Sequence, residues 1–245
     1  MAVIHRTTMT PTKLELLAAW LPLRSWYSGA GDVTQLSRAG GFRLDDPEGE
    51  VGIEFMVVTD GSGGVPVAYH VPLTYRGAPL AGAGAGLIGT SEHGVLGTRW
   101  IYDGAHDPVL VGQLLALLAG RTAAQAQGES DTPDPTVEAH PAHGGVPAVL
   151  TGPADVADTA DATVVAVGRA GGPGTPTLTV ARVLRPGPAA GEGLLGQVLA
   201  RWTAPDGAEQ RGAFAVLRNG GAAEAGRPAL TGPERRGSRP ASGRP

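Results

Sequence analysis

The chain has 245 residues, a formal net charge of −4 and no cysteine. The missing cysteines exclude disulfides, thiolate chemistry and cysteine-ligated metal sites, and the acidic balance provides no positive field for nucleic acid or an anionic membrane surface. The N-terminal residues lack the pattern of a signal peptide and no apolar run is long enough to span a membrane. We therefore expect a cytoplasmic protein whose partners include neither nucleic acid nor a membrane.

Two stretches predict α-helices, and both begin with the same signal. A residue that can cap a helix precedes a proline, whose missing N–H is harmless in the first helical turn, at Thr10-Pro11 and at Asp107-Pro108. Leucines spaced along one helical face follow each signal. The pattern predicts helices over residues 12–21 and 108–119, each with a leucine face turned to a core.

Three segments between these helices predict β-strands. Apolar residues alternate in residues 50–59 and 65–75, and the glycine-rich residues 60–64 between them predict the turn of a hairpin. Residues 98–102 predict one more short strand. Antiparallel strands combined with helices indicate an α+β domain over residues 1–121.

The second half of the chain has a different composition. Residues 122–148 show no hydrophobic periodicity and are rich in small and polar residues, which predicts a flexible linker. Residues 149–219 predict a β-rich segment that either extends the first sheet or forms a small second domain, most simply as a four-stranded meander. Residues 220–245 contain almost no large apolar side chain, which predicts a disordered tail. The four strand-like runs are residues 163–168, 178–184, 194–202 and 210–218.

Two blocks of uncommon residues stand out in the first half. One runs from Trp20-Leu21-Pro22 to Trp26-Tyr27-Ser28-Gly29, and the other begins at Val71-Pro72-Leu73-Thr74-Tyr75-Arg76 and ends at Asp107-Pro108-Val109. Over roughly residues 10–121 the chain resembles the N-terminal cap domain of actinobacterial maltokinases. The resemblance implies a cystatin-like cap, in which helices pack on a curved antiparallel sheet.

The resemblance also carries an expectation about function. Maltokinases make maltose 1-phosphate for α-glucan synthesis and hold their chemistry in a kinase-like C-terminal domain, for which this chain has no room. Phosphoryl transfer needs a cation on the ATP phosphates and a carboxylate base, yet Lys13 is the only lysine and no catalytic loop or phosphate loop occurs. We therefore expect a non-catalytic accessory or regulatory cap-like protein of maltose and α-glucan (glycogen, trehalose) metabolism. It would bind no cofactor and act through a partner such as a sugar kinase or an α-glucan enzyme in trans.

Residues 91–107 bring histidine, acidic, arginine and aromatic side chains together within a short stretch. A turn after the first helix holds two more aromatic residues. Arginine beside tryptophan suits recognition of a sugar or a phosphate, although a strand tryptophan equally fits a core position. We expect these positions to form a binding or contact surface. The candidate residues are Trp26, Tyr27, His93, Arg99, Trp100 and Asp103.

Two alternatives stay open. One is a carbohydrate- or sugar-phosphate-binding protein that uses the turn aromatics and Arg99. The other is an enzyme of unassigned class built on Glu92, His93, Asp103 and His106. The spacing of these last four residues matches no standard metal motif, so we expect no metal site.

Overall fold

The computed structural model describes residues 7–29, 35–62, 65–141, 155–167 and 175–220. This part of the chain is mostly β and forms two curled antiparallel sheets with a few helices. No helix within it has the length and apolar character needed to cross a membrane. The predicted tail beyond Gly220, and residues 142–148 of the predicted linker, lie outside the described residues.

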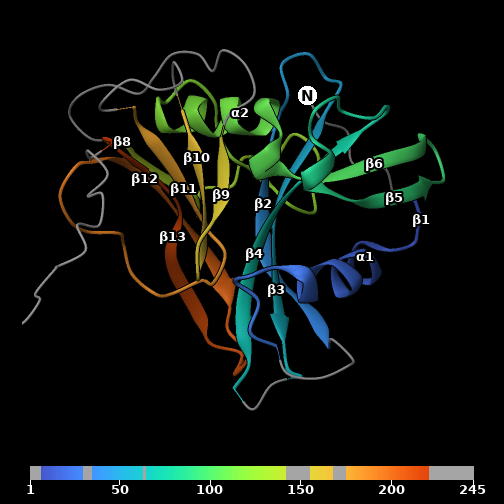
Figure 1. Cartoon of the computed structure of the whole chain (residues 1–245), viewed down its shortest axis with the longest axis horizontal. Helices are drawn as coiled ribbons and strands as arrows, with labels where there is room; N and C mark the ends of the chain where they lie inside the picture. Colours follow the sequence, from blue (N-terminus) through green and yellow to red (C-terminus); the bar gives the residue numbers. More distant parts are fainter. Residues whose placement is uncertain (1–6, 30–34, 63–64, 142–154, 168–174, 221–245) are drawn as a thin grey trace, which may run out of the picture.

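The first sheet has seven strands in the order β1-β5-β6-β4-β3-β2-β7 (Figure 1). The predicted hairpin is β3 and β4, and the predicted short strand is β6; both predictions are confirmed. The other strands of this sheet were not predicted. The strands are β1 (Met9–Thr10), β2 (Leu36–Leu44), β3 (Gly52–Asp60), β4 (Val67–Arg76), β5 (Leu87–His93), β6 (Gly97–Asp103) and β7 (Gln125–Ala126).

The second sheet has six strands in the order β8-β12-β13-β11-β10-β9. The four predicted runs correspond to β10 to β13, but the meander is wrong because β13 lies between β11 and β12. After β11 the chain leaves this sheet and pairs with β4. It re-enters the sheet as β12, and β13 then pairs with both β11 and β12. The strands are β8 (Glu138–Pro141), β9 (Val156–Asp158), β10 (Ala162–Ala166), β11 (Thr177–Ala181), β12 (Leu194–Thr203) and β13 (Glu209–Arg218).

Two α-helices occur in the described ranges, at the places predicted. The second, α2 (Pro108–Leu118), begins as expected, because Asp107 caps it by accepting from the N–H of Val109. The first, α1 (Lys13–Trp20), is capped by Thr12, which exchanges hydrogen bonds with Glu15 in a capping box. Thr10, the expected cap, instead pairs with β5 as part of β1. Three short 3-10 helices complete the set: η1 (Leu21–Leu23), η2 (Gly84–Gly86) and η3 (Gly104–His106).

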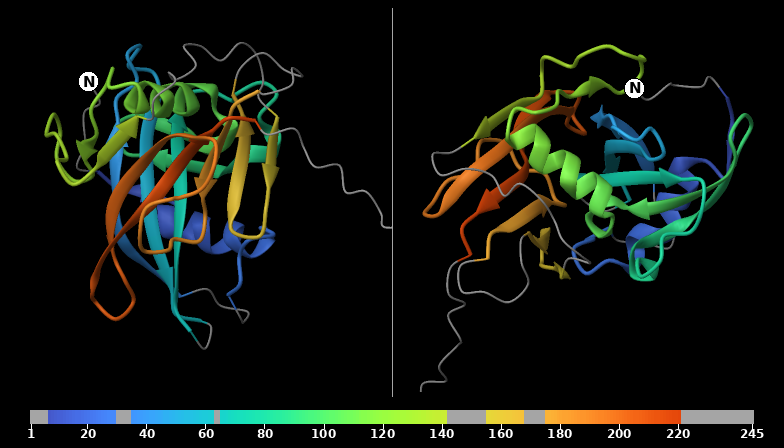
Figure 2. Two further views of the ribbon diagram at one scale, coloured as in Figure 1. Left: turned by 90° about the vertical axis from the view of Figure 1, so that its left-hand side faces the viewer. Right: turned by 90° about the horizontal axis from the view of Figure 1, so that it is seen from above.

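The central strands of the first sheet, β3 and β4, are buried on both faces. Successive residues of β3 point to opposite sides, so Phe55 and Val57 enter the core between the two sheets, whereas Met56 and Val58 enter a second core under α1. α2 lies across one end of the two sheets and adds its leucines to the first core (Figure 2). The near-continuous apolar run of β3 therefore reflects burial on two faces.

The second half of the chain packs on the first half and shares its core. Residues just after β11 pair with β4: the N–H of His70 donates to the carbonyl of Arg182 at 2.8 Å, and the N–H of Leu184 donates to that of Ala68 at 3.0 Å. Trp202 and Phe214 belong to the same hydrophobic cluster as the inner face of β3. The β-rich segment thus forms a second sheet whose core is continuous with that of the first.

The region expected to be a linker is ordered over residues 122–141. β7 pairs with β2, and β8 pairs with β12, so the segment adds an edge strand to each sheet. Turn hydrogen bonds support it, including those from Ala126 to Thr132 and from Asp134 to Ala124. Two- and four-residue strands carry too few residues to show a periodicity, which is why composition suggested a linker.

β2 was missed because Gly40 and Gly41 interrupt its pattern, and glycine weakens a strand. Both have positive φ, at +137° and +134°, and the register of β2 against β3 shifts beside them. A Cβ on Gly41 would lie 2.1 Å from the carbonyl oxygen of Phe55. The glycine pair therefore allows a bend and a close approach that a side chain would prevent.

A buried ion pair joins the two sheets. The Arg182 guanidinium, fully buried, donates to the Asp103 carboxylate at 2.5 Å and to the Thr163 hydroxyl at 2.7 Å, and lies over the ring of Trp26. Asp103 also accepts from the N–H of Ala105. Asp103, a candidate binding residue, is therefore an internal structural group, because its carboxylate is committed to the contact between the sheets.

Asp103→Ala should lower the free energy of unfolding by about 3–5 kcal/mol, because it leaves the Arg182 charge buried and unpaired. The matched control is Glu209→Ala, which breaks an exposed ion pair with Arg201 and should cost under about 1 kcal/mol. Urea unfolding followed by circular dichroism measures both. Equal losses in the two variants would contradict the structural role of the buried pair.

A buried histidine lies in the same interface. The His70 ring packs between Phe55 and Phe214, and its Nδ1 lies 2.8 Å from the carbonyl oxygen of Ala181, which makes Nδ1–H the donor. Burial, assisted by the nearby Arg182 charge, lowers the pKa of His70 to about 3 against the opposing effect of the Ala181 carbonyl. The folded protein therefore holds this ring neutral.

Because the unfolded chain protonates His70 near its ordinary pKa of about 6.5, the unfolded state binds more protons below that pH. The stability that His70 contributes is complete above pH 6.5 and declines as the pH falls toward 3, at up to about 1.4 kcal/mol per pH unit. His70→Leu should flatten the slope of stability between pH 6.5 and 5. Urea titrations of both proteins at several pH values test this, and identical slopes would refute it.

Candidate functional site

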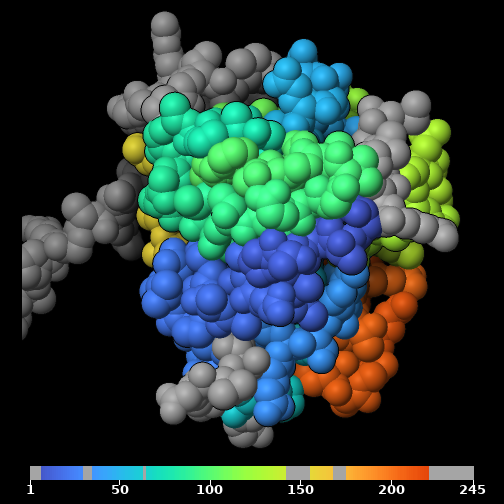
Figure 3. All heavy atoms as spheres, turned by 90° about the vertical axis from the view of Figure 1, so that its right-hand side faces the viewer, coloured from blue at the N-terminus to red at the C-terminus, as the bar shows by residue number. Residues whose placement is uncertain are grey.

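A cavity of about 540 Å³ opens where the start of α1, strands β2 to β4 and the tip of the β5–β6 hairpin meet. Figure 3 shows α1 and this hairpin side by side on one face of the molecule. A second hollow of about 660 Å³ adjoins it and shares Arg43, Tyr75 and Arg99. The polar lining of the first cavity includes Lys13, Arg38, Arg43, Glu54, Tyr75 and Arg99.

Glu54 organises the floor of this cavity. Its carboxylate accepts from the Lys13 ammonium at 2.5 Å, the Tyr75 hydroxyl at 2.6 Å and the Gln127 amide at 2.8 Å, and Arg38 lies 3.8 Å away. Burial opposes its ionisation, but the Lys13 charge and these hydrogen bonds outweigh burial and lower the pKa of Glu54. Burial and the Glu54 charge raise the pKa of Tyr75 well above its usual value. Glu54 is thus a held carboxylate and Tyr75 a neutral donor.

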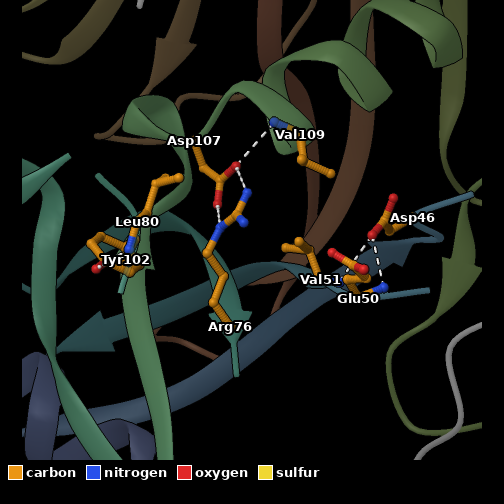
Figure 4. Close-up of polar contacts among 8 residues, drawn as sticks. All are labelled: Asp46, Glu50, Val51, Arg76, Leu80, Tyr102, Asp107 and Val109. Atoms are coloured by element: carbon orange, nitrogen blue, oxygen red, sulfur yellow. Dashed lines mark hydrogen bonds and ion pairs between the residues drawn. The ribbon is translucent and has the colours of Figure 1, made fainter. Parts of the chain in front are cut away.

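A second polar cluster borders the adjoining hollow (Figure 4). Arg76 makes a bidentate ion pair with Asp107, both contacts at 2.7 Å, and Asp107 also caps α2. The Asp46 carboxylate stabilises the loop that follows it by accepting hydrogen bonds from the N–H groups of Glu50 and Val51. These carboxylates have their hydrogen bonds within the protein, so the cluster reads as scaffold for the rim of the hollow.

Residues 20–107 match the family model of the maltokinase N-terminal cap domain. This match confirms the predicted resemblance: residues 20–107 are similar to a maltokinase N-terminal cap domain. No curated protein matches the chain. The matched residues cover β2 to β6 and end at the cap of α2, so α2 and the second sheet lie outside the match.

The tryptophan and tyrosine of the cap domain's first block are not both surface residues. Trp26 is 2% exposed and packs against Trp20 and Tyr69, which contradicts the contact surface expected of it. Tyr27 is half-buried, and its hydroxyl donates to the Asp60 carboxylate. The aromatic turn was predicted as a surface from its local sequence, which cannot show that β3 and β4 cover it.

The remaining candidates separate into two groups. His93 and Arg99 line the cavity. Trp100 is half-buried in β6, beside Arg76 of β4, and lines neither hollow. The described residues contain no group of three or more histidine and acidic side chains placed to hold a metal.

Several cavity residues were not predicted. Glu54 had a signal, because a carboxylate inside an apolar strand needs a partner when buried. Lys13 had a weaker sequence signal, namely that it is the only lysine of the chain. Arg38 and Arg43 lie on the unpredicted β2, and Gln127 lies in the region taken as a linker. Lys13 and Gln127 also lie outside the matched cap domain, so flanking sequence completes the Glu54 network.

Two substitutions at one position separate the two roles of Asp107. Asp107→Asn keeps a side chain that can cap α2 but loses the charge opposite Arg76. It should lower the free energy of unfolding by about 1–3 kcal/mol. Asp107→Ala loses both contributions and should cost about 1 kcal/mol more. Denaturant unfolding measures both variants. If the alanine variant is no less stable than the asparagine variant, the side-chain cap does not contribute.

Proposed function

We propose that this protein is a non-catalytic accessory or regulatory module of maltose and α-glucan metabolism, including glycogen and trehalose, that acts through a partner such as a sugar kinase. The observation that carries the proposal is the cap-domain match over residues 20–107. The cystatin-like character of the curled sheet, and a cytoplasmic, actinobacterial setting, are parts of the same proposal.

The internal roles of the cap residues support this proposal. Trp26, Asp103 and Asp107 are buried, and each is used in packing, an ion pair or a helix cap. All three lie within the matched residues 20–107, and their internal roles support the interpretation of this stretch as a structural scaffold. A scaffold acts on another protein through its surface.

The tip of the β5–β6 hairpin is a surface suited to a partner. Val95 and Leu96 are 62% and 44% exposed there, and Figure 1 shows the hairpin projecting from the body of the sheets. Exposed apolar side chains on a projecting turn lose unfavourable hydration when a partner covers them. A carbohydrate surface on Trp26 and Tyr27 has less support, because Trp26 is buried and the Tyr27 hydroxyl is bonded to Asp60.

The experiment mixes the full chain with a purified maltose-phosphorylating kinase. We expect a complex in sedimentation velocity at micromolar concentrations and a change in the KM or kcat of the kinase. Val95→Asp should weaken binding by about tenfold or more, since it places a charge in an apolar contact. Val65→Asp is the matched control, because Val65 is 80% exposed in the β3–β4 turn.

Binding should be unchanged in the Val65→Asp control. The proposal of a kinase partner fails if no complex forms at tens of micromolar and kinase activity is the same with and without the chain. Equal weakening by Val95→Asp and Val65→Asp would move the contact away from the hairpin tip.

A further inference from the structure

We propose that the cavity beside α1 binds a small phosphorylated sugar, with Arg38, Arg43 and Arg99 on the phosphate and the Glu54–Tyr75 pair on the sugar hydroxyls. This site does not depend on a kinase partner. It is also distinct from the turn aromatics considered above.

The first observation is a reversal of charge. The chain as a whole has a net charge of −4. The cavity is lined by four cationic side chains, Lys13, Arg38, Arg43 and Arg99, against the single carboxylate of Glu54, a local balance of 4 − 1 = +3. A concave site lined by one sign of charge focuses its field and attracts the opposite charge. The ligand should therefore be an anion small enough to enter the cavity.

The second observation is that the arginines have donors to spare. The side chain of Arg43 makes no hydrogen bond or ion pair within the described part of the chain, and Arg38 is exposed with its nearest carboxylate oxygen 3.8 Å away. Arg99 donates to the Leu96 carbonyl, but its buried Nε has no hydrogen-bond partner within that part. A guanidinium fork matches the oxygens of a phosphate. Three such groups around one cavity favour phosphate over a singly charged carboxylate.

The floor of the cavity suits the rest of the ligand. Glu54 and Tyr75 are held in place by Lys13 and Gln127, so they present an acceptor and a phenol in fixed positions. Hydroxyl groups of a sugar can donate to the carboxylate, while the partly exposed apolar side chains of Met9, Leu14 and Leu96 can cover its C–H surface. A volume of about 540 Å³ lies within the range of small-molecule sites.

Calorimetry with the full chain tests the site, using glucose 1-phosphate as the probe, and maltose and inorganic phosphate as comparison arms. We expect glucose 1-phosphate to bind more tightly than either comparison. Arg43→Ala and Arg99→Ala should each raise its Kd by about tenfold or more, the loss expected for a charge-assisted hydrogen bond. Arg201→Ala, on β12 of the second sheet and paired with Glu209, is the control and should leave the Kd unchanged. Arg43 has no structural partner, so its variant should keep the circular dichroism spectrum of the parent.

The only lysine of the chain provides an independent readout. Lys13 is 30% exposed at the cavity, so glucose 1-phosphate should slow its acylation by an amine reagent, as followed by peptide mass spectrometry. The proposal is overturned if glucose 1-phosphate does not bind at millimolar concentrations, or if Arg43→Ala leaves the Kd unchanged. The proposal is also overturned if inorganic phosphate or maltose binds as tightly as glucose 1-phosphate. In that case the site would recognise only the phosphate or only the sugar.

Discussion

Burial of the β3–β4 pair on both of its faces is the constraint on which the rest of the structure depends. One face meets the second sheet and α2, and the other meets α1 and the turn that follows it. A sheet that is apolar on two sides cannot stand alone in water, because each uncovered face would expose a continuous hydrophobic surface. The second half of the chain is therefore part of the same folding unit as the strands of the cap domain.

Polar groups inside this arrangement fix how the layers sit together. The Arg182–Asp103 ion pair and the His70–Ala181 hydrogen bond both connect the strands of the cap domain to the second half of the chain. A buried polar group is costly unless it meets its partner, so these contacts penalise any other register of the two layers. Asp103 was predicted as a binding residue from its local sequence, but its carboxylate holds the two layers together through the ion pair with Arg182.

The outer face of the cap domain carries the features that suit function. The cavity beside α1 concentrates arginines in an acidic protein, and the hairpin tip next to it exposes apolar side chains. Leu96 belongs to both, because it lines the cavity and lies at the exposed tip. A ligand in the cavity and a partner on the hairpin would meet at this residue, which gives the two proposed activities a physical route for influencing each other.

The sequence by itself determined the strongly periodic elements: the β3–β4 hairpin, β6, the Asp107 cap of α2 and the cap-domain family, since alternation, capping residues and rare residues are local properties. It did not reveal β2 or the two short edge strands. Only the tertiary structure decided that Trp26 is buried, that Asp103 pairs with Arg182, and that Gln127 joins Lys13 at Glu54. Each of these outcomes depends on contacts between residues far apart in the chain, which no local pattern records.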